Sequence, residues 1–320
     1  MLETVLSREE FKEAPPVLVD VGASGDVFGP WRTIARFCHC VAFDPDARDL
    51  ALLETRSSSF KSLRIVPRIV ADQTLPQKAF YLAQAPHCSS CLEPNLSSLQ
   101  DYTFARGFET AKTVDLPTIT LGDALREAGL SRIDWLKVDS QGMDLRIFGS
   151  LSTHVADEII VVDFEPGIIG AYLGEDKLHA VLAHMEPRSF WCSQFEVQGD
   201  FRINHELFQR SFDAKEQRLI RRTQKVAPGW AQLQYFNAFR LESRRSLRDC
   251  LLGWVFATIA GQHLFAFQLA SAMEEQYSDS MARALALASR RAIRRTGFRI
   301  LAKKAWNKIW DRSMGRSSNP

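Results

Sequence analysis

The chain has 320 residues, of which 46% are hydrophobic, and a formal net charge of +2. This composition predicts a globular protein with one large core, or with one large and one small domain. No apolar run of about 18 residues free of polar groups occurs and the N-terminal segment is charged, so we expect neither a membrane span nor a secretory leader. Six scattered cysteines then favour reduced thiols and a cytoplasmic location.

The N-terminal part of the chain alternates strand and helix patterns. Val17–Val21 predicts a short buried strand, followed by a helix over 28–37 and a second strand over 40–43. A helix over 47–54 and a third strand over 64–71 extend the alternation. Because strands alternate with helices at these connection lengths, we expect right-handed crossovers and a parallel sheet.

The turn after the first strand indicates which nucleotide it would bind. A dinucleotide fold has G-x-G-x-x-G here, whereas this chain has D-x-G-x-x-G, with Asp20 in place of the first glycine. A carboxylate would repel a pyrophosphate but suits S-adenosylmethionine, which carries an ammonium and a sulfonium and no phosphate. We therefore expect a turn formed by Asp20, Gly22, Ala23 and Gly25 to bind S-adenosylmethionine rather than NAD or FAD.

Acidic residues also follow the second and third predicted strands. Asp44 lies 19 residues after Gly25, close to the position from which a carboxylate accepts hydrogen bonds from ribose hydroxyls. Asp46 is a second candidate, although it also suits a cap for the following helix. Asp72 would bond the adenine amino group. Acids at three successive strand ends favour a nucleoside site at one edge of the sheet.

The next segment changes from loops to regular elements. Residues 73–117 contain many Pro, Ser and Gly, and we expect them to cover the carboxyl edge of the sheet. A helix is expected to begin at Thr120 and to end at Gly129, because apolar residues recur on one face between them. A strand over 133–138 and a short helix over 143–148 follow.

The segment LPTITLGDALREAGLSRIDWLKVDSQGMDLRIFGSL, residues 116–151, resembles the FkbM family of S-adenosylmethionine-dependent methyltransferases. The residues that match the family's helix, strand and turn motifs are Thr120, Leu121, Ile133, Asp134, Leu136, Lys137, Val138, Asp139 and Gly142. The opening VLVDVGASG resembles the family's first motif. Residues 87–95 resemble its Ser-Ser-Leu loop, which places Ser89 and Ser90 at the cofactor site. The resemblance covers about residues 15–245 and implies an α/β, Rossmann-like (class I) methyltransferase sheet with helices on both faces.

The resemblance implies O-methylation of a sugar or other small polar hydroxyl acceptor, with Asp139 and Gln141 in catalytic positions. Asp139 at a strand end suits a proton acceptor, and it equally suits a cap for the following helix. The family usually has Glu where this chain has Gln141, and Gln keeps the hydrogen-bonding shape without the charge. Two alternatives therefore stay open: a degenerate module that binds cofactor or a partner without catalysis, and a nucleotide-dependent oxidoreductase, against which Asp20 argues.

Two further acids end the next predicted strand, over 158–164. Asp163 and Glu165 suit the binding of a polyol acceptor, or they are ordinary loop acids. The remaining elements expected in this part of the chain are a helix over 177–185 and an antiparallel pair of edge strands over 189–197 and 232–241.

The cysteine spacings raise the question of a metal site. Cys38 and Cys40 form C-x-C, and Cys88 and Cys91 form C-x-x-C. Structural zinc sites usually combine two well-spaced pairs. We expect small buried thiols and no metal.

After about residue 245 the pattern is helical. We therefore divide the chain into a methyltransferase-like domain over 1–245 and a helical, basic extension over 246–320. Residues 251–272 are mostly apolar but contain Gln and His, which predicts a buried helix rather than a membrane span.

The end of the chain is strongly basic. Residues 290–320 contain ten Lys or Arg and one acid, so this segment carries +9 while the other 289 residues carry −7. Over 282–310 the cations are interleaved with apolar residues that include Trp306 and Trp310. This mixture favours contact of residues 290–316 with an anionic membrane over contact with nucleic acid. The alternative is a solvated helix face.

Overall fold

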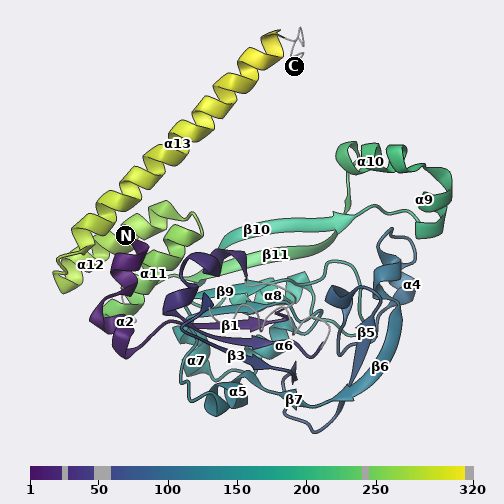
Figure 1. Cartoon of the computed structure of the whole chain (residues 1–320), viewed down its shortest axis with the longest axis horizontal. Helices are drawn as coiled ribbons and strands as arrows, with labels where there is room; N and C mark the ends of the chain where they lie inside the picture. Colours follow the sequence, from purple (N-terminus) through teal and green to yellow (C-terminus); the bar gives the residue numbers. More distant parts are fainter. Residues whose placement is uncertain (24–27, 47–58, 240–244, 314–320) are drawn as a thin grey trace. The chain divides into compact units, whose positions relative to one another are not determined.

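The computed structural model describes residues 1–23, 28–46, 59–239 and 245–313, and only the backbone of 303–305 and 307–313 (Figure 1). The chain forms two compact units: an α/β unit over 13–240, and a helical unit that combines residues 1–12 with residues 241–320. The membership of residues 1–12 in the helical unit was not expected from the sequence.

A seven-stranded mixed sheet forms the centre of the α/β unit, in the order β10-β11-β9-β8-β1-β2-β3. The strands are β1 (Val17–Val21), β2 (His39–Phe43), β3 (Ser62–Val66), β8 (Trp135–Val138), β9 (Val161–Phe164), β10 (Phe190–Asp200) and β11 (Ala227–Asn237). Parallel pairing joins β3, β2, β1, β8 and β9, whereas β11 is antiparallel to both of its neighbours. The expected α/β fold, with a parallel sheet and an antiparallel pair at its edge, is confirmed.

The two faces of the sheet differ in chemistry. On one face Val19, Leu136 and Val162 are register partners, and they belong to a large apolar core. The helices that pack into this core are α5 (Leu121–Glu127), α6 (Asp144–Gly149), α7 (Thr153–Glu158) and α8 (Leu178–Met185). Because side chains alternate along a strand, the opposite face carries the residues one position further on. These include Asp20 and Lys137, which are register partners of each other.

The order of the strands determines where a ligand can bind. From β1 the chain adds β2 and β3 on one side, and it later adds β8 and β9 on the other. The carboxyl ends of β1 and β8 therefore flank the point where the winding direction reverses. In open α/β sheets this is where ligands bind.

Two expected elements differ in detail, and a third cannot be compared. The strand expected over 64–71 is interrupted at Pro67, which has no N–H to donate, and residues 69–70 form β4 (Ile69–Val70) in a separate sheet with β7 (Thr118–Ile119). The helix expected over 28–37 consists instead of two 3-10 turns, η1 (Gly29–Thr33) and η2 (Ala35–Phe37). The helix expected over 47–54 lies outside the described residues.

The segment 73–117 contains more regular structure than expected. It forms a hairpin of β5 (Lys78–Ala83) and β6 (Thr110–Leu116). The short helices within it are η4 (Pro86–Cys88), α4 (Leu96–Leu99) and η5 (Ala105–Phe108). Another insertion, between β10 and β11, forms α9 (His205–Ser211) and α10 (Ala214–Thr223).

Local signals placed α5 correctly. The Thr120 side chain accepts a hydrogen bond from Asp123 N at 3.1 Å and caps the helix, and Gly129 ends it with a φ of +68°. Strand β9 begins at Val161 rather than at Glu158, which is the last residue of α7.

The helical unit contains α1 (Leu2–Leu6), α2 (Glu9–Glu13), α11 (Leu247–Ile259), α12 (His263–Tyr277) and α13 (Ala282–Ser313). Arg8 joins its two sequence segments, with Nη2 2.8 Å from Asp279 Oδ2. The single helix expected over 251–272 is broken into α11 and α12 at Gly261, whose φ is +73°. Among the described residues, no helix is both long and apolar enough to cross a membrane.

Candidate active site

A cavity opens at the carboxyl ends of β1, β2 and β8. Gly22 follows β1, Asp44 follows β2, and Asp139 and Gln141 follow β8. The segment between β5 and α4 contributes His87 and Ser89 to the same lining. The cavity therefore occupies the predicted position, where the winding of the sheet reverses.

Gly22 brings the ends of three strands together. Gly22 N donates to Phe43 O at 3.0 Å, and Gly22 O accepts from Lys137 Nζ at 2.9 Å. A Cβ on this residue would lie 2.0 Å from Asp139 O, and the φ of Gly22 is +76°. A glycine is thus required for close backbone approach between β1 and β8.

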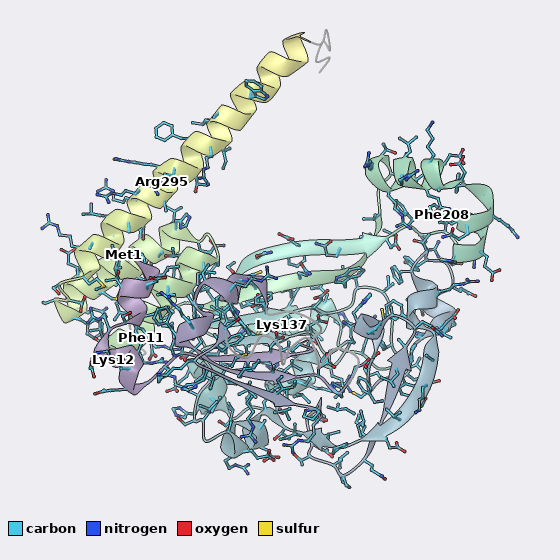
Figure 2. The ribbon with its side chains drawn as sticks, viewed as in Figure 1. Met1, Phe11, Lys12, Lys137, Phe208 and Arg295 are labelled. Atoms are coloured by element: carbon cyan, nitrogen blue, oxygen red, sulfur yellow. The ribbon has the colours of Figure 1, made fainter. Side chains whose placement is uncertain are left out.

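Asp20 lies below the cavity and does not line it. Only 4% of its surface is exposed, and Lys137 Nζ lies 3.1 Å from Asp20 Oδ1 and 3.6 Å from Asp139 Oδ2. Figure 2 labels Lys137 within the sheet. Burial alone would lower the pKa of Lys137, but the carboxylates of Asp20 and Asp139 raise it above its usual value. The carboxylate that was expected to face a ligand is instead paired with an internal ammonium.

Gln141 forms hydrogen bonds with three residues around the two cavities. Its Nε2 donates to Asp139 Oδ1 at 2.6 Å, and its Oε1 lies 3.0 Å from the Tyr172 hydroxyl. The residue has a φ of +57°, which is uncommon outside glycine, and its carbonyl oxygen accepts from Ser90 Oγ at 2.8 Å. The side-chain amide of Gln141 is thus a neutral hydrogen-bond donor that orients the Asp139 carboxylate. A Glu at position 141 would instead place a second carboxylate next to Asp139.

Asp144 ties the ends of β8 and β9 together. Its Oδ1 accepts from Ser140 N at 3.0 Å and from Ser140 Oγ at 2.6 Å, and its Oδ2 accepts from Glu165 N at 2.8 Å. Burial, partly offset by the hydrogen bond from Ser140, raises the pKa of Asp144 to about 6. Asp144 is thus a support for the two loops rather than a lining residue.

A second cavity adjoins the first. His87 and Gln141 line both cavities. Aromatic rings in sequential contact form one wall of the second cavity: Trp230 to Phe104 at 6.3 Å, Phe104 to Phe108 at 5.4 Å, and Phe108 to Tyr172 at 5.5 Å. The carboxylates in its lining belong to Glu165, Glu175 and Asp200. A small molecule with apolar faces and hydroxyl groups fits such a lining.

Glu165 is a carboxyl group in this lining whose acidity is strongly changed. Burial raises its pKa to about 8, and the negative charges of Asp139 and Asp144 contribute to the rise. At neutral pH its carboxyl group is therefore largely protonated, and it loses its proton just above neutrality. Asp163 lies on β9, just before Glu165. Its carboxylate accepts hydrogen bonds from the side chains of Trp135 and Gln234 on the neighbouring strands.

The remaining predicted site residues divide into three groups. Asp44 and Ser89 line the first cavity, as does Asp46, whose backbone N–H donates to Asp44 Oδ1 at 2.7 Å. Ala23 and Asp72 do not line it: Ala23 packs against Ala42, and Asp72 is exposed after β4. Ser90 supports Gln141, as described above, and Gly25 lies outside the described residues.

The cysteines in both spacing motifs are free thiols. Cys38, Cys40 and Cys88 are buried, and burial raises the pKa of Cys88 to about 12. Among the described residues, no group of three or more His, Cys, Asp and Glu side chains is arranged to hold a metal ion.

The charged side chains in the lining of the first cavity are mostly acidic. Asp44, Asp46 and Asp139 all line it, while Arg68, its one lining Lys or Arg among the described residues, is ion-paired with Glu127. A pyrophosphate would face these carboxylates, whereas a cationic nucleoside would be attracted to them. Apolar residues that could contact a base are Ile69, Val70 and Phe80.

A comparison with known protein families identifies a domain within the α/β unit. Residues 38–195 match the profile of the family described as the methyltransferase FkbM domain. No curated protein matches the chain significantly. The matched segment contains β2, β3, β8, β9 and the loops that carry Asp44, Ser89, Asp139 and Gln141. Residues 38–195 of the chain therefore form a methyltransferase FkbM domain.

Proposed function

We propose that the protein is an S-adenosylmethionine-dependent methyltransferase that O-methylates a hydroxyl of a sugar or a similar small polar acceptor. The observation that carries the proposal is the set of three carboxylates, Asp44, Asp46 and Asp139, in the lining of a cavity at the switch point of a methyltransferase sheet. These carboxylates favour a donor with an ammonium and a sulfonium over a dinucleotide. Asp44, at the end of β2, is positioned to accept hydrogen bonds from the ribose hydroxyls.

The second cavity is the proposed acceptor site. Its wall of aromatic rings would pack against the C–H face of a sugar ring, while Glu165, Glu175 and Asp200 would accept hydrogen bonds from hydroxyl groups. Gln141 and His87 stand where the two cavities meet, so an acceptor hydroxyl near them would lie next to the donor. The six free cysteines support a reducing, cytoplasmic compartment.

Glu165 is the proposed proton acceptor. S-adenosylmethionine supplies a methyl group already activated by its sulfonium, so the protein must align the acceptor and remove one proton. The carboxylate of Asp139 is engaged by Gln141 Nε2 and lies near Lys137, which suits an orienting role. Glu165 faces the acceptor cavity, and its pKa of about 8 matches proton transfer near neutral pH.

The proposal is tested by methyl transfer to an extract of cell-envelope glycans. We expect a product heavier by one methyl group, and a rate that rises with pH towards about 8, because Glu165 must lose its proton to act as a base. Glu165→Gln should lower the rate by roughly 100-fold or more and abolish this rise. Glu158→Gln, at a partly exposed carboxylate outside both cavities, is the matched control and should behave as the unaltered protein.

Two results would count against these assignments. An unchanged rate and pH profile in Glu165→Gln would remove Glu165 from the reaction. If the protein binds cofactor but methylates nothing in any extract, Gln141 marks a binding module without catalysis. Gln141→Glu provides the comparison for that case, because it restores the carboxylate that is usual in the family.

A further inference from the structure

Helix α13 has two apolar stripes: the first is buried within the helical unit, and the second is exposed in the part of the chain that the structure describes. Ala282, Leu285 and Ser289 are buried, and α13 packs along α12. The Ser289 hydroxyl accepts a hydrogen bond from Trp254 Nε1 of α11 at 3.0 Å. The first stripe is therefore part of the core of the helical unit.

The second stripe lies further along the same helix. Phe298 is 72% exposed, Leu301 is 64% exposed and Trp306 is 67% exposed. The spacings of three, five and eight residues place these side chains within about 140° of one another around the helix. At about 100° per residue, this side is roughly opposite the one that carries Leu285 and Ser289. In Figure 1 this part of α13 extends beyond α11 and α12.

Positive charge surrounds the second stripe. Arg290, Arg291, Arg294, Arg295 and Arg299 are all exposed, and Figure 2 labels Arg295 on this stretch of the helix. The sequence from 290 to 320 has ten Lys or Arg and one acid. A partner must therefore offer both apolar cover and negative charge.

We propose that this distal part of α13 lies flat on the surface of an anionic phospholipid bilayer, with Phe298, Leu301 and Trp306 inserted at the boundary between headgroups and acyl chains. The cations would contact the lipid phosphates, and a Trp suits this interfacial depth. A second copy of the helix would bring a like charge of +9 against this one. Nucleic acid would neutralise the cations but leave the apolar stripe in water. Of these three partners, the anionic bilayer is the one that satisfies both the apolar and the charged parts of the surface.

The test is co-sedimentation of the full-length protein with vesicles. We expect binding to vesicles of phosphatidylcholine mixed with phosphatidylserine, little binding to phosphatidylcholine alone, and release as salt is raised. Leu301→Ser should weaken the partition roughly tenfold, because each buried methylene contributes to membrane binding. Leu264→Ser, which alters a similarly exposed leucine on α12, is the matched control and should bind as the unaltered protein.

A fluorescence measurement separates insertion from simple charge attraction. The emission of Trp306 should shift to the blue on binding to the mixed vesicles, and this shift should be missing in Trp306→Phe. Thermal unfolding that is unchanged by Leu301→Ser would show that the helical unit still folds. Equal binding to neutral vesicles, equal binding of Leu301→Ser and the unaltered protein, or binding to RNA but not to vesicles would each overturn the proposal.

Discussion

Gly22 shows how a single backbone position holds the cavity together. It lies between Phe43 O on one side and Asp139 O on the other, with a positive φ. In a dinucleotide fold, glycines at this turn let a phosphate approach the backbone. Here the close approach is between two segments of the protein itself, so the glycine is explained without any phosphate.

Substituting Gly22 should therefore lower the free energy of unfolding by more than the strain of a positive φ alone would. Gly129→Ala is the control, because Gly129 has a similar φ of +68° and open space around its Cα. We expect Gly129→Ala to lower the free energy of unfolding by about 1–2 kcal/mol. Gly22→Ala should lower it considerably more, because the Asp139 carbonyl must also move. Urea unfolding measures both changes, and equal losses would contradict the role given to Gly22.

Asp20 and Lys137 form a buried ion pair, and its disruption should reduce stability. We expect Asp20→Asn to lower the free energy of unfolding by about 3 kcal/mol, because the buried ammonium of Lys137 then keeps the Gly22 carbonyl but loses its nearer carboxylate and retains the more distant Asp139. Adding Lys137→Met should recover part of that loss, which a double-mutant cycle in urea would measure. If Asp20→Asn abolished cofactor binding without lowering the free energy of unfolding, Asp20 would instead contact the ligand directly.

At the scale of elements, the sequence predicted those helix boundaries that depend on residues close together in the chain. Thr120 and Gly129 bound α5 as expected, because a side-chain cap and a left-handed glycine act within one turn of helix. The break at Pro67 could have been read from the same kind of signal, since proline cannot donate to a ladder. The glycine at 261 likewise marks the end of α11, although the apolar run continues through it.

The aromatic wall of the second cavity could not be predicted in this way. Phe104 and Phe108 belong to the segment between β5 and β6, Tyr172 follows β9, and Trp230 lies on β11. No periodicity connects these segments, and their contacts depend on how the loops pack over the sheet. The same limit applies to Asp20, because its partner depends on the register between β1 and β8, which lie more than 100 residues apart.

At the scale of the whole molecule, the sequence predicted an α/β part followed by a helical, basic part. It did not predict that residues 1–12 join the helical unit, because the contact between Arg8 and Asp279 spans 271 residues. The net charge is also divided along the chain: the last 31 residues carry +9 and the other residues carry −7. The acidic part contains the three carboxylates of the first cavity, and the basic end is the proposed membrane contact.

The most direct measurement is calorimetric titration of the full chain with S-adenosylhomocysteine and, separately, with NAD. We predict one site for S-adenosylhomocysteine and no heat of binding with NAD. Asp44→Asn should weaken the site roughly tenfold, the effect of losing a hydrogen bond to a charged group. Asp115→Asn, an exposed carboxylate on β6, should leave it unchanged. Binding of NAD alone, or unweakened binding by Asp44→Asn, would contradict the assignment of the first cavity to S-adenosylmethionine.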